Sequence, residues 1–472
     1  MKVLKRVRKL LILAISLQLT VLHAETKPLD STVKKNTVQQ IGELMIDNYV
    51  FPEVAKETAK TLTSQLEAGK FDDFNQPEAL ARALTDELQA ITGDKHLRVR
   101  GLRSGGSHHS QEDAVSEHLS RREYSRQANM GVSEVRKLEG NVGYLELKSF
   151  SELSQAKPLL DSAMLLLSTS DAIIIDLRKN GGGDPATVQY LSSYFFDEKL
   201  LLNSLYWREG EITNEFWTLD SVDGQKMPSV PLYILTSSRT FSAAEEFSYN
   251  MQTRKRATLI GETTGGGANP GRGFRINDYF GMFIATGRAI NPVTKTNWEG
   301  VGVAPEIEVK ADEAFDRAVT HAAKAAEEMR QAHILKYKTD FLSFYQWLDS
   351  SVKDVNVSDF NTKKTQLFSK LTKFQNRLEL NQMQLNSIGY EYLTHKQQPL
   401  VALLFMQFNV EKYPESANAY DSLGEVLLAL DQPGKAKKVF EKGLTIIGEN
   451  ELQLQRTLTM NLEKAKQQLA NQ

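Results

Sequence analysis

The first part of the chain places apolar side chains at helical spacing. The segments VQQIGELMIDNYV, VAKETAKTLTSQLEAG and PEALARALTDELQAIT carry them three and four residues apart. This spacing is typical of helices that bury one face. The pattern predicts a helical N-terminal unit over residues 25–95.

Short β-branched runs replace this pattern between Gly140 and Val309. The runs are VGYLEL, DAIIIDL, VPLYILT, RATLIG and GMFIATG, and glycine turns and helical segments near 155–168, 185–196 and 243–251 separate them. Strands that alternate with helices indicate an α/β sheet. We therefore predict an α/β core over residues 96–310, in which the polar stretch 102–127 forms a loop with some helix.

The last third of the chain is helical in character. An alanine-rich segment predicts a connecting helix over residues 311–340, and residues 341–472 follow as a helical region. Seven positions match the spacing of tetratricopeptide units: Ala402, Pro414, Tyr420, Leu423, Gly424, Ala436 and Phe440. Because such repeats bury their apolar faces against one another, we expect two helical hairpins that also pack against neighbouring helices or against the core domain, and that could bind protein partners.

The N-terminus has the features of a secretory signal peptide. Five basic residues precede an apolar stretch from Leu10 to about Leu22, which is too short to span a bilayer. We expect cleavage near Ala24, and a soluble mature chain in the periplasm or outside the cell, with no stable membrane span.

Charge and cysteine content restrict the possible partners. Without residues 1–24, the chain carries 52 basic and 59 acidic residues, a net charge of about −7, and it has no basic domain. Nucleic-acid binding is therefore not expected. The chain contains no cysteine, so its stability must come from packing rather than from disulfides.

Ser242 stands in SRTFSAAEEF, between an apolar run and a helical segment. A serine at this junction commonly caps the helix. It can also be a nucleophile, because a strand–turn–helix elbow exposes the hydroxyl beside the positive end of the helix. The local sequence leaves both readings open.

A nucleophilic serine needs a base and a place for the oxyanion. His96 in GDKHLRV is a candidate base, and Glu299 in NWEGVGV is a candidate carboxylate behind it, although each could be an ordinary polar residue. The glycine turn RKNGGGD lacks the spacing of a nucleotide-binding loop. It could present bare N–H groups to an oxyanion, or it could simply be a tight turn.

A metal site is not expected. His108, His109 and His118 lie in a polar stretch without carboxylates at a known ligand spacing.

Five motifs together resemble the tail-specific, C-terminal-processing serine peptidases: GDKHLRV, DLRKNGGG, TSSRTFSAAEEF, RATLIGETTGGGA and NWEGVGVAPEIEV. The resemblance covers about residues 49–309, and the motifs occur in the family's order. One branch of that family uses a Ser–Lys dyad, and Gly267 holds the position of its lysine here. The chain instead resembles the branch of the tricorn core protease and the interphotoreceptor retinoid-binding protein modules, in which a histidine is the base.

The resemblance implies a crotonase-like or ClpP-like ββα spiral and a serine peptidase without metal or organic cofactor. Ser242 would be the nucleophile, His96 the base and Glu299 the carboxylate behind it. The N–H of Ala243, with that of Gly182 or Gly183, would form the oxyanion hole. This sequence departs from the tricorn pattern in two respects: it has Lys95 where a serine precedes the histidine, and it has no room for a PDZ domain before Gly140.

The sequence thus predicts a secreted or periplasmic peptidase that hydrolyses peptides or unfolded proteins. An imidazole base would give activity that rises between about pH 6 and 7.5. The alternative is a non-catalytic module that binds a ligand or a protein on the same scaffold.

Overall fold

The computed structural model describes residues 29–102, 111–352, 355–448 and 450–472. The chain divides into two compact units, one that ends at Met329 and one that comprises Arg330–Gln472. Each unit has its own hydrophobic core. The expected signal peptide and two of the three loop histidines, His108 and His109, lie outside the described residues.

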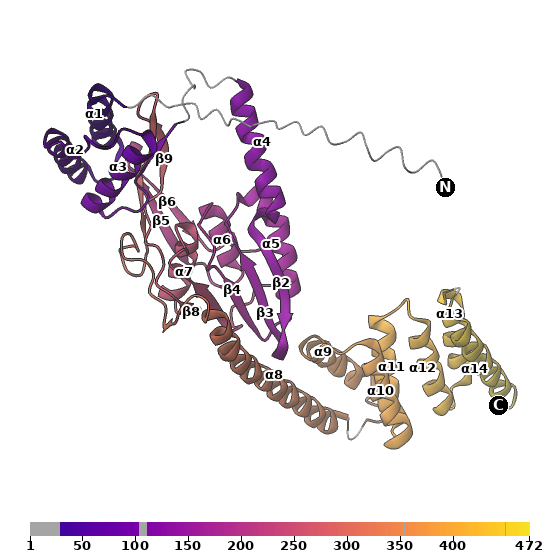
Figure 1. Ribbon diagram of the computed structural model, residues 1–472. Helices are drawn as coiled ribbons and strands as arrows, with labels where there is room; N and C mark the ends of the chain where they lie inside the picture. The colour runs from indigo at the N-terminus through magenta and orange to yellow at the C-terminus, as the bar shows by residue number, and fades with distance from the viewer. Residues whose placement is uncertain (1–28, 103–110, 353–354, 449) are drawn as a thin grey trace, which may run out of the picture. The chain divides into compact units, whose positions relative to one another are not determined.

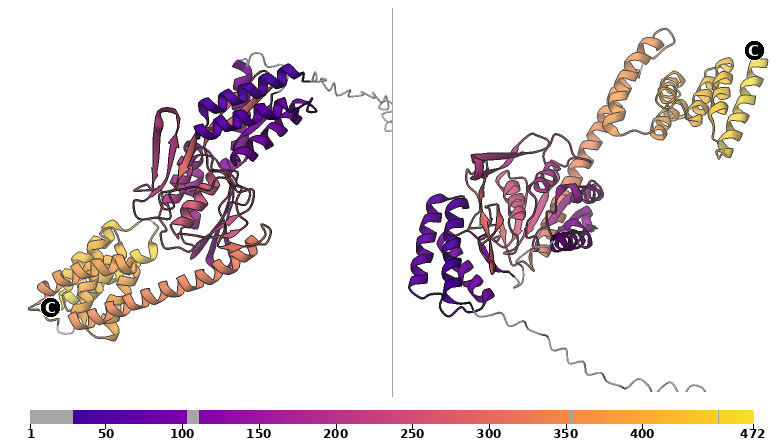
Figure 2. Two further views of the ribbon diagram at one scale, coloured as in Figure 1. Left: turned by 90° about the vertical axis from the view of Figure 1, so that its left-hand side faces the viewer. Right: turned by 90° about the horizontal axis from the view of Figure 1, so that it is seen from above.

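Three helices lie side by side at one end of the first unit (Figures 1 and 2). They are α1 (Ser31–Asn48), α2 (Pro52–Glu67) and α3 (Pro77–Thr92). Proline begins α2 and α3, at the position where a missing N–H costs nothing. Gly93 ends α3 with a φ of 74°, a left-handed cap that glycine adopts without strain. The helical N-terminal region is confirmed, and its last turn leads directly to His96.

A six-stranded sheet forms the centre of the first unit, with strand order β12-β8-β7-β4-β3-β2. Its strands are β2 (Val132–Leu138), β3 (Val142–Leu147), β4 (Ala172–Asp176), β7 (Leu232–Thr236), β8 (Thr258–Gly261) and β12 (Ile307–Glu308). All neighbours are parallel except β2 and β3, which are antiparallel. The predicted mixed α/β class is confirmed.

Both faces of this sheet are covered, which explains why β4 is apolar from Ala172 to Ile175. Ile173 and Ile175 pack on one face with α5 (Leu153–Leu167), α6 (Pro185–Ser193) and α7 (Ala243–Thr253). Ile174 packs on the other face, against buried alanines at the start of α8 (Ala314–Val352). A parallel strand buried on both faces carries a continuous apolar run rather than an alternating one.

Two smaller antiparallel sheets complete the first unit. One contains β1 (Arg98–Gly101), β10 (Phe280–Ala285) and β9 (Gly271–Arg275), and the other contains β11 (Gly287–Ile290), β5 (Leu201–Trp207) and β6 (Ile212–Trp217). The predicted strand GMFIATG is therefore β10, which pairs with β1 and not with the central strands. This pairing holds the segment after α3 against the rest of the unit.

The polar stretch before the sheet contains more helix than the sequence suggested. It forms the 17-residue helix α4 (Gln111–Gln127). His118 lies exposed on this helix.

The second unit is entirely helical over its described residues. It contains the part of α8 after Met329, then α9 (Phe360–Leu378), α10 (Gln382–Tyr390), a π-helical segment (Glu391–His395), α11 (Pro399–Lys412), α12 (Ala417–Ala429), α13 (Pro433–Ile446) and α14 (Leu452–Ala470). The helical C-terminal region is confirmed, although α8 continues to Val352, beyond the predicted 340. On α12, a Cβ at Gly424 would lie 2.2 Å from the ring of Phe440 on α13, so α12 and α13 approach closely at this glycine.

Within the described ranges, no helix is both long enough and apolar enough to cross a membrane.

Candidate active site

Ser242 stands at a sharp turn between β7 and α7, in a backbone conformation that non-glycine residues rarely adopt. Its φ and ψ are 56° and −122°. Such a conformation costs on the order of 1–3 kcal/mol and persists only where neighbouring contacts impose it. One contact is the bond from the Phe241 N–H to the carbonyl of Asn180, at 3.0 Å. The turn places the Ser242 hydroxyl at the positive end of α7.

The carboxylate of Glu245 is the main support of this turn. It is fully buried and accepts the Ser242 N–H at 2.8 Å. It also accepts the N–H groups of Gly266 and Gly267 at 2.6 and 2.8 Å, and the hydroxyl of Thr264 at 2.5 Å. Burial raises the pKa of Glu245. One side chain therefore ties the serine turn to residues 264–267.

This role of Glu245 was not predicted from the sequence, although a signal for it is present there. Serine followed three residues later by glutamate, as in SAAE, is the pattern of a helix capping box.

His96 reaches Ser242 from the other side of the site. Its Nε2 lies 3.3 Å from the Ser242 Oγ. The backbone N–H of His96 donates to the buried carboxylate of Asp94 at 2.9 Å, and this hydrogen bond fixes the turn after α3. The ring of Phe241 lies 4.7 Å from the imidazole, centroid to centroid, and limits its rotation. The structure thus brings the two predicted residues to contact distance.

Glu299 lies behind the imidazole, at the distance of a loose ion pair. Its Oε2 is 3.9 Å from the Nδ1 of His96, too far for a hydrogen bond, and the buried Nδ1 has no hydrogen-bond partner among the described residues. Three backbone N–H groups hold the carboxylate, from Lys95 at 3.0 Å, Ala268 at 2.5 Å and Asn269 at 2.9 Å. Distances of this kind often shorten only when substrate is bound.

The two titratable groups have strongly shifted pKa values. Burial, with a smaller effect of the positive charge on Arg98, lowers the pKa of His96 to about 4. Burial and the negative charge of Asp94 raise the pKa of Glu299 to about 7. At neutral pH, His96 is therefore unprotonated and able to accept a proton, while Glu299 is close to its midpoint.

Gly267 shows why a lysine cannot occupy the dyad position here. A Cβ at Gly267 would lie 2.2 Å from the Phe241 ring and 2.7 Å from the Cε1 of His96. Any side chain at this position would therefore have to displace the Phe241 ring, the imidazole or both. The volume that a lysine would use is already filled by His96 and Phe241.

The glycine turn after β4 lies directly against Ser242. Gly182 has a φ of 104°, and a Cβ there would lie 2.7 Å from the Ser242 Cβ and 3.0 Å from the Ala243 nitrogen. The Gly182 N–H donates to the Asn180 side chain at 2.9 Å. Ala243 is the first residue of α7, so its N–H has no partner inside the helix. Because Gly182 has no side chain, the space beside the Ser242 hydroxyl and the Ala243 N–H stays open.

Asp94, His96 and Glu299 could in principle hold a cation, because one donor atom from each lies within 4.8 Å of the others. Both oxygens of Glu299 already accept N–H groups. Asp94 accepts from His96 and, at 3.2 Å each, from Tyr49 and Asn269. Since these oxygens serve the protein's own donors, we assign no metal to the cluster.

The two adjacent glutamates of α7 should respond in opposite ways to replacement by glutamine. In Glu245→Gln, at least one backbone N–H would face the new NH₂ group, so we expect a loss of about 1–3 kcal/mol of unfolding free energy. In Glu246→Gln, we expect a gain at pH 8. Burial raises the pKa of Glu246 to about 7, so the stability associated with its bound proton is complete below about pH 4.5 and is lost as the pH rises through 7, by up to about 3 kcal/mol.

Denaturant unfolding of the full chain at pH 5 and pH 8 measures both effects. Equal changes in the two variants would contradict the structural role of Glu245. A pH dependence in Glu246→Gln that is unchanged from the parent would contradict the assignment of the titrating group.

Comparison with known proteins gives matches over the first unit. Residues 141–309 match the model of peptidase family S41, and residues 30–130 match the model of the N-terminal domain of Peptidase_S41 in eukaryotic IRBP. The chain is 25% identical over 166 residues to carboxyl-terminal-processing peptidase 1, chloroplastic, of Arabidopsis thaliana. It is 28% identical over 152 residues to a carboxyl-terminal-processing protease of Synechocystis.

These relatives are matched over only part of their length. The alignments cover 35% of this chain and 33% of the Arabidopsis protein, and 32% of this chain and 34% of the Synechocystis protein. Among solved structures, the tricorn protease is similar with a TM-score of 0.39 and 14% identity, over 63% of this chain and 37% of that chain. The resemblance to C-terminal-processing peptidases is confirmed by the family models and the relatives: residues 141–309 are similar to peptidase family S41, and residues 30–130 to an N-terminal domain found with it.

Proposed function

We propose that this protein is a serine peptidase that hydrolyses peptides or unfolded protein segments, with Ser242 as nucleophile, His96 as general base and Glu299 as the carboxylate that orients and stabilises the imidazole. The observation that carries the proposal is the 3.3 Å contact between His96 Nε2 and Ser242 Oγ at the start of a helix. A non-catalytic module would not need a strained serine turn with an unprotonated imidazole beside it.

The geometry supports a two-step acyl transfer. The Ser242 oxygen attacks the scissile carbonyl carbon while its proton passes to His96 Nε2. The carbonyl oxygen becomes an oxyanion, and we propose that the N–H groups of Ala243 and Gly183 donate hydrogen bonds to it. Gly182, which has no side chain, would leave space for this oxygen beside Ser242. His96 then donates its proton to the leaving amine, and water releases the acyl group by the same route.

The choice of base rests on volume as well as on distance. A lysine at position 267 would collide with His96 and Phe241. A lysine base at this position and a histidine base at position 96 therefore exclude each other. Glu299 would approach Nδ1 more closely once the imidazole is protonated, because the ion pair then becomes attractive.

Three finer features belong to the same proposal. The core would be a crotonase-like or ClpP-like spiral that acts without metal or organic cofactor. The chain would be secreted or periplasmic, after removal of residues 1–24. The helices after α8 would be tetratricopeptide-like, as the contact between Gly424 and Phe440 supports.

Replacement of Ser242 and Gly182 should abolish peptide hydrolysis, with a neighbouring glycine as the control. Ser242→Ala should lower kcat by on the order of 10⁴-fold or more. Gly182→Ala should be nearly as damaging, because its methyl group would fill the space beside Ser242 at a φ that alanine avoids. Gly181→Ala should keep most of the activity, because its Cβ would meet no atom within 4 Å. Equal activity of the Gly181 and Gly182 variants would contradict the proposed oxyanion site.

The pH dependence should identify Glu299, rather than His96, as the group that titrates near neutrality. Because the pKa of His96 is about 4, its base form is already present above pH 5. Because the pKa of Glu299 is about 7, kcat/KM should rise through pH 7 as this carboxylate gains the charge that stabilises the imidazolium.

In Glu299→Gln, the remaining kcat/KM should be low and flat near pH 7. Thermal unfolding is the control, since one backbone N–H loses its acceptor in this variant. If kcat/KM of Glu299→Gln still rose near pH 7 as in the parent protein, His96 itself would be the group that titrates there.

We further propose that the second unit recruits protein substrates or partners rather than taking part in catalysis. Its core is separate from the cores of the first unit, so removal of residues 330–472 should leave kcat/KM for a short peptide nearly unchanged and raise KM for an unfolded protein. Loss of short-peptide activity together with a lower melting temperature would show that the second unit only supports the fold.

A further inference from the structure

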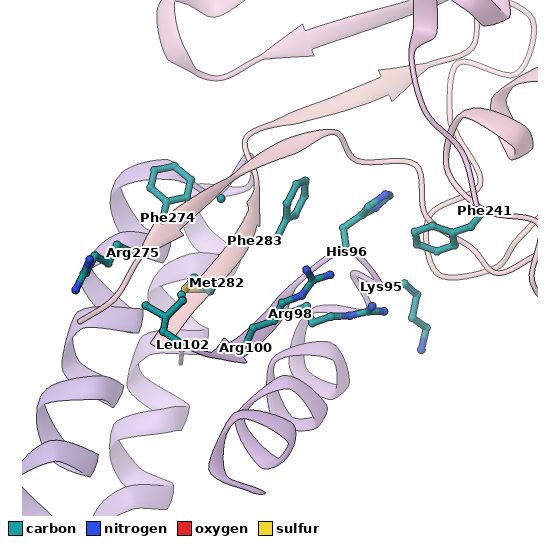
Figure 3. Close-up of a pocket in the computed structure, with 12 residues that line it drawn as sticks. Lys95, His96, Arg98, Arg100, Leu102, Phe241, Phe274, Arg275, Met282 and Phe283 are labelled. Atoms are coloured by element: carbon teal, nitrogen blue, oxygen red, sulfur yellow. The ribbon is translucent and has the colours of Figure 1, made fainter. Parts of the chain in front are cut away.

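A pocket of about 670 Å³ opens directly beside the proposed base. His96 and Phe241 form one end of it, and β1, β9 and β10 supply most of the rest of its lining. Phe283 and Met282 make it largely apolar, as Figure 3 shows. A peptide bound at Ser242 would therefore place a neighbouring side chain in this pocket.

The pocket also carries several positive charges on one face of β1. Arg98 pairs with Phe283 and Arg100 with Gly281 in the β1–β10 register, and residues paired across strands project on the same side of a sheet. In Figure 3 the Arg98 and Arg100 side chains lie side by side below the rings of Phe283 and His96, with Lys95 beside them.

These charges have no acidic counterpart in the pocket. The lining contains no aspartate or glutamate. Across the parts of the chain that the structure describes, no carboxylate forms an ion pair with Arg98, Arg100 or Lys95. The positive charge of Arg98 is close enough to help lower the pKa of His96. Apolar side chains and guanidinium groups without a carboxylate partner thus line the same pocket. This combination suits a ligand with an apolar body and an anionic end.

We propose that this pocket selects substrates with an acidic side chain next to an apolar residue, within a few residues of the bond that is cut. The inference rests on the proposed peptidase function and specifies the substrate class of the same site. Arg100 is a specificity residue in this proposal, since its guanidinium group would pair with the substrate carboxylate. A free C-terminal carboxylate has the same chemistry as a glutamate side chain, so the test must separate the two sources.

Three matched peptides provide that separation. The first carries glutamate after a phenylalanine and has an amidated C-terminus. The second has glutamine in place of the glutamate. The third has the same glutamine and a free C-terminal carboxylate. We expect kcat/KM of the full-length protein to be about 10-fold or more higher for the first peptide than for the second, and this ratio to fall as ionic strength rises.

Arg100→Gln should bring this ratio close to one, and Arg100→Glu should bring it below one, because the new carboxylate would repel the glutamate peptide. Arg317→Gln is the matched control, because Arg317 is an exposed arginine outside the pocket, and it should keep the full ratio. A ratio near one in the parent protein, or a ratio that Arg100→Gln leaves unchanged, would overturn the proposal. A preference for the third peptide alone would overturn it in favour of C-terminal recognition.

A binding measurement separates this inference from the proposed peptidase function. Fluorescence anisotropy of labelled peptides with Ser242→Ala should give a Kd about 10-fold lower for the glutamate peptide than for the glutamine peptide. This result does not depend on hydrolysis. Failure of the parent protein to cut any of the peptides would therefore contradict the peptidase function. Equal Kd values for the glutamate and glutamine peptides would contradict the proposed specificity of the pocket.

Discussion

The buried carboxylate of Glu245 is the interaction on which the site depends. It accepts N–H groups from Ser242, Gly266 and Gly267, and thus ties together the turn that carries the proposed nucleophile and the loop that passes under the imidazole. Without these bonds, the left-handed conformation of Ser242 would relax. The hydroxyl would then leave the positive end of α7, and Gly267 would no longer define the space in which His96 lies.

The second constraint is the competition for space at residue 267. The C-terminal-processing peptidases that this region resembles include a branch with a Ser–Lys dyad, and glycine at this position frees the volume that His96 and Phe241 occupy. The histidine arrives from a distant part of the chain, through the end of α3 and the pairing of β1 with β10. The end of the helical N-terminal region is therefore next to the site, because it leads directly to the proposed base. The strand that follows, β1, contributes Arg98 and Arg100, which line the adjoining pocket.

The sequence predicted several of the elements whose burial is reflected in their composition. The run DAIIIDL became β4, and the three amphipathic segments became α1, α2 and α3. Strands β6 and β9 were not predicted, because most of their residues are exposed or half-buried and carry no apolar run. The end of α8 was placed too early, since apolar residues that pack in a different core, such as Phe344 and Leu348, continue the helix past its alanines.

Motifs pointed to three residues that lie close together in the structure, whereas no motif pointed to their electrostatics. Ser242, His96 and Glu299 do lie together, but no sequence pattern reports the degree of burial that lowers the pKa of His96 to about 4 and raises that of Glu299 to about 7. The structure therefore moves the group expected to titrate near neutrality from the imidazole to the carboxylate.

The most direct test of the account is the rate at which a fluorophosphonate labels the full-length protein, with the labelled residue mapped by mass spectrometry. The account predicts a single modified residue, Ser242, and a labelling rate at pH 8 that falls at least 100-fold in His96→Gln, since a serine without its base is a weak nucleophile. Labelling at another residue, or an unchanged rate in His96→Gln, would contradict it.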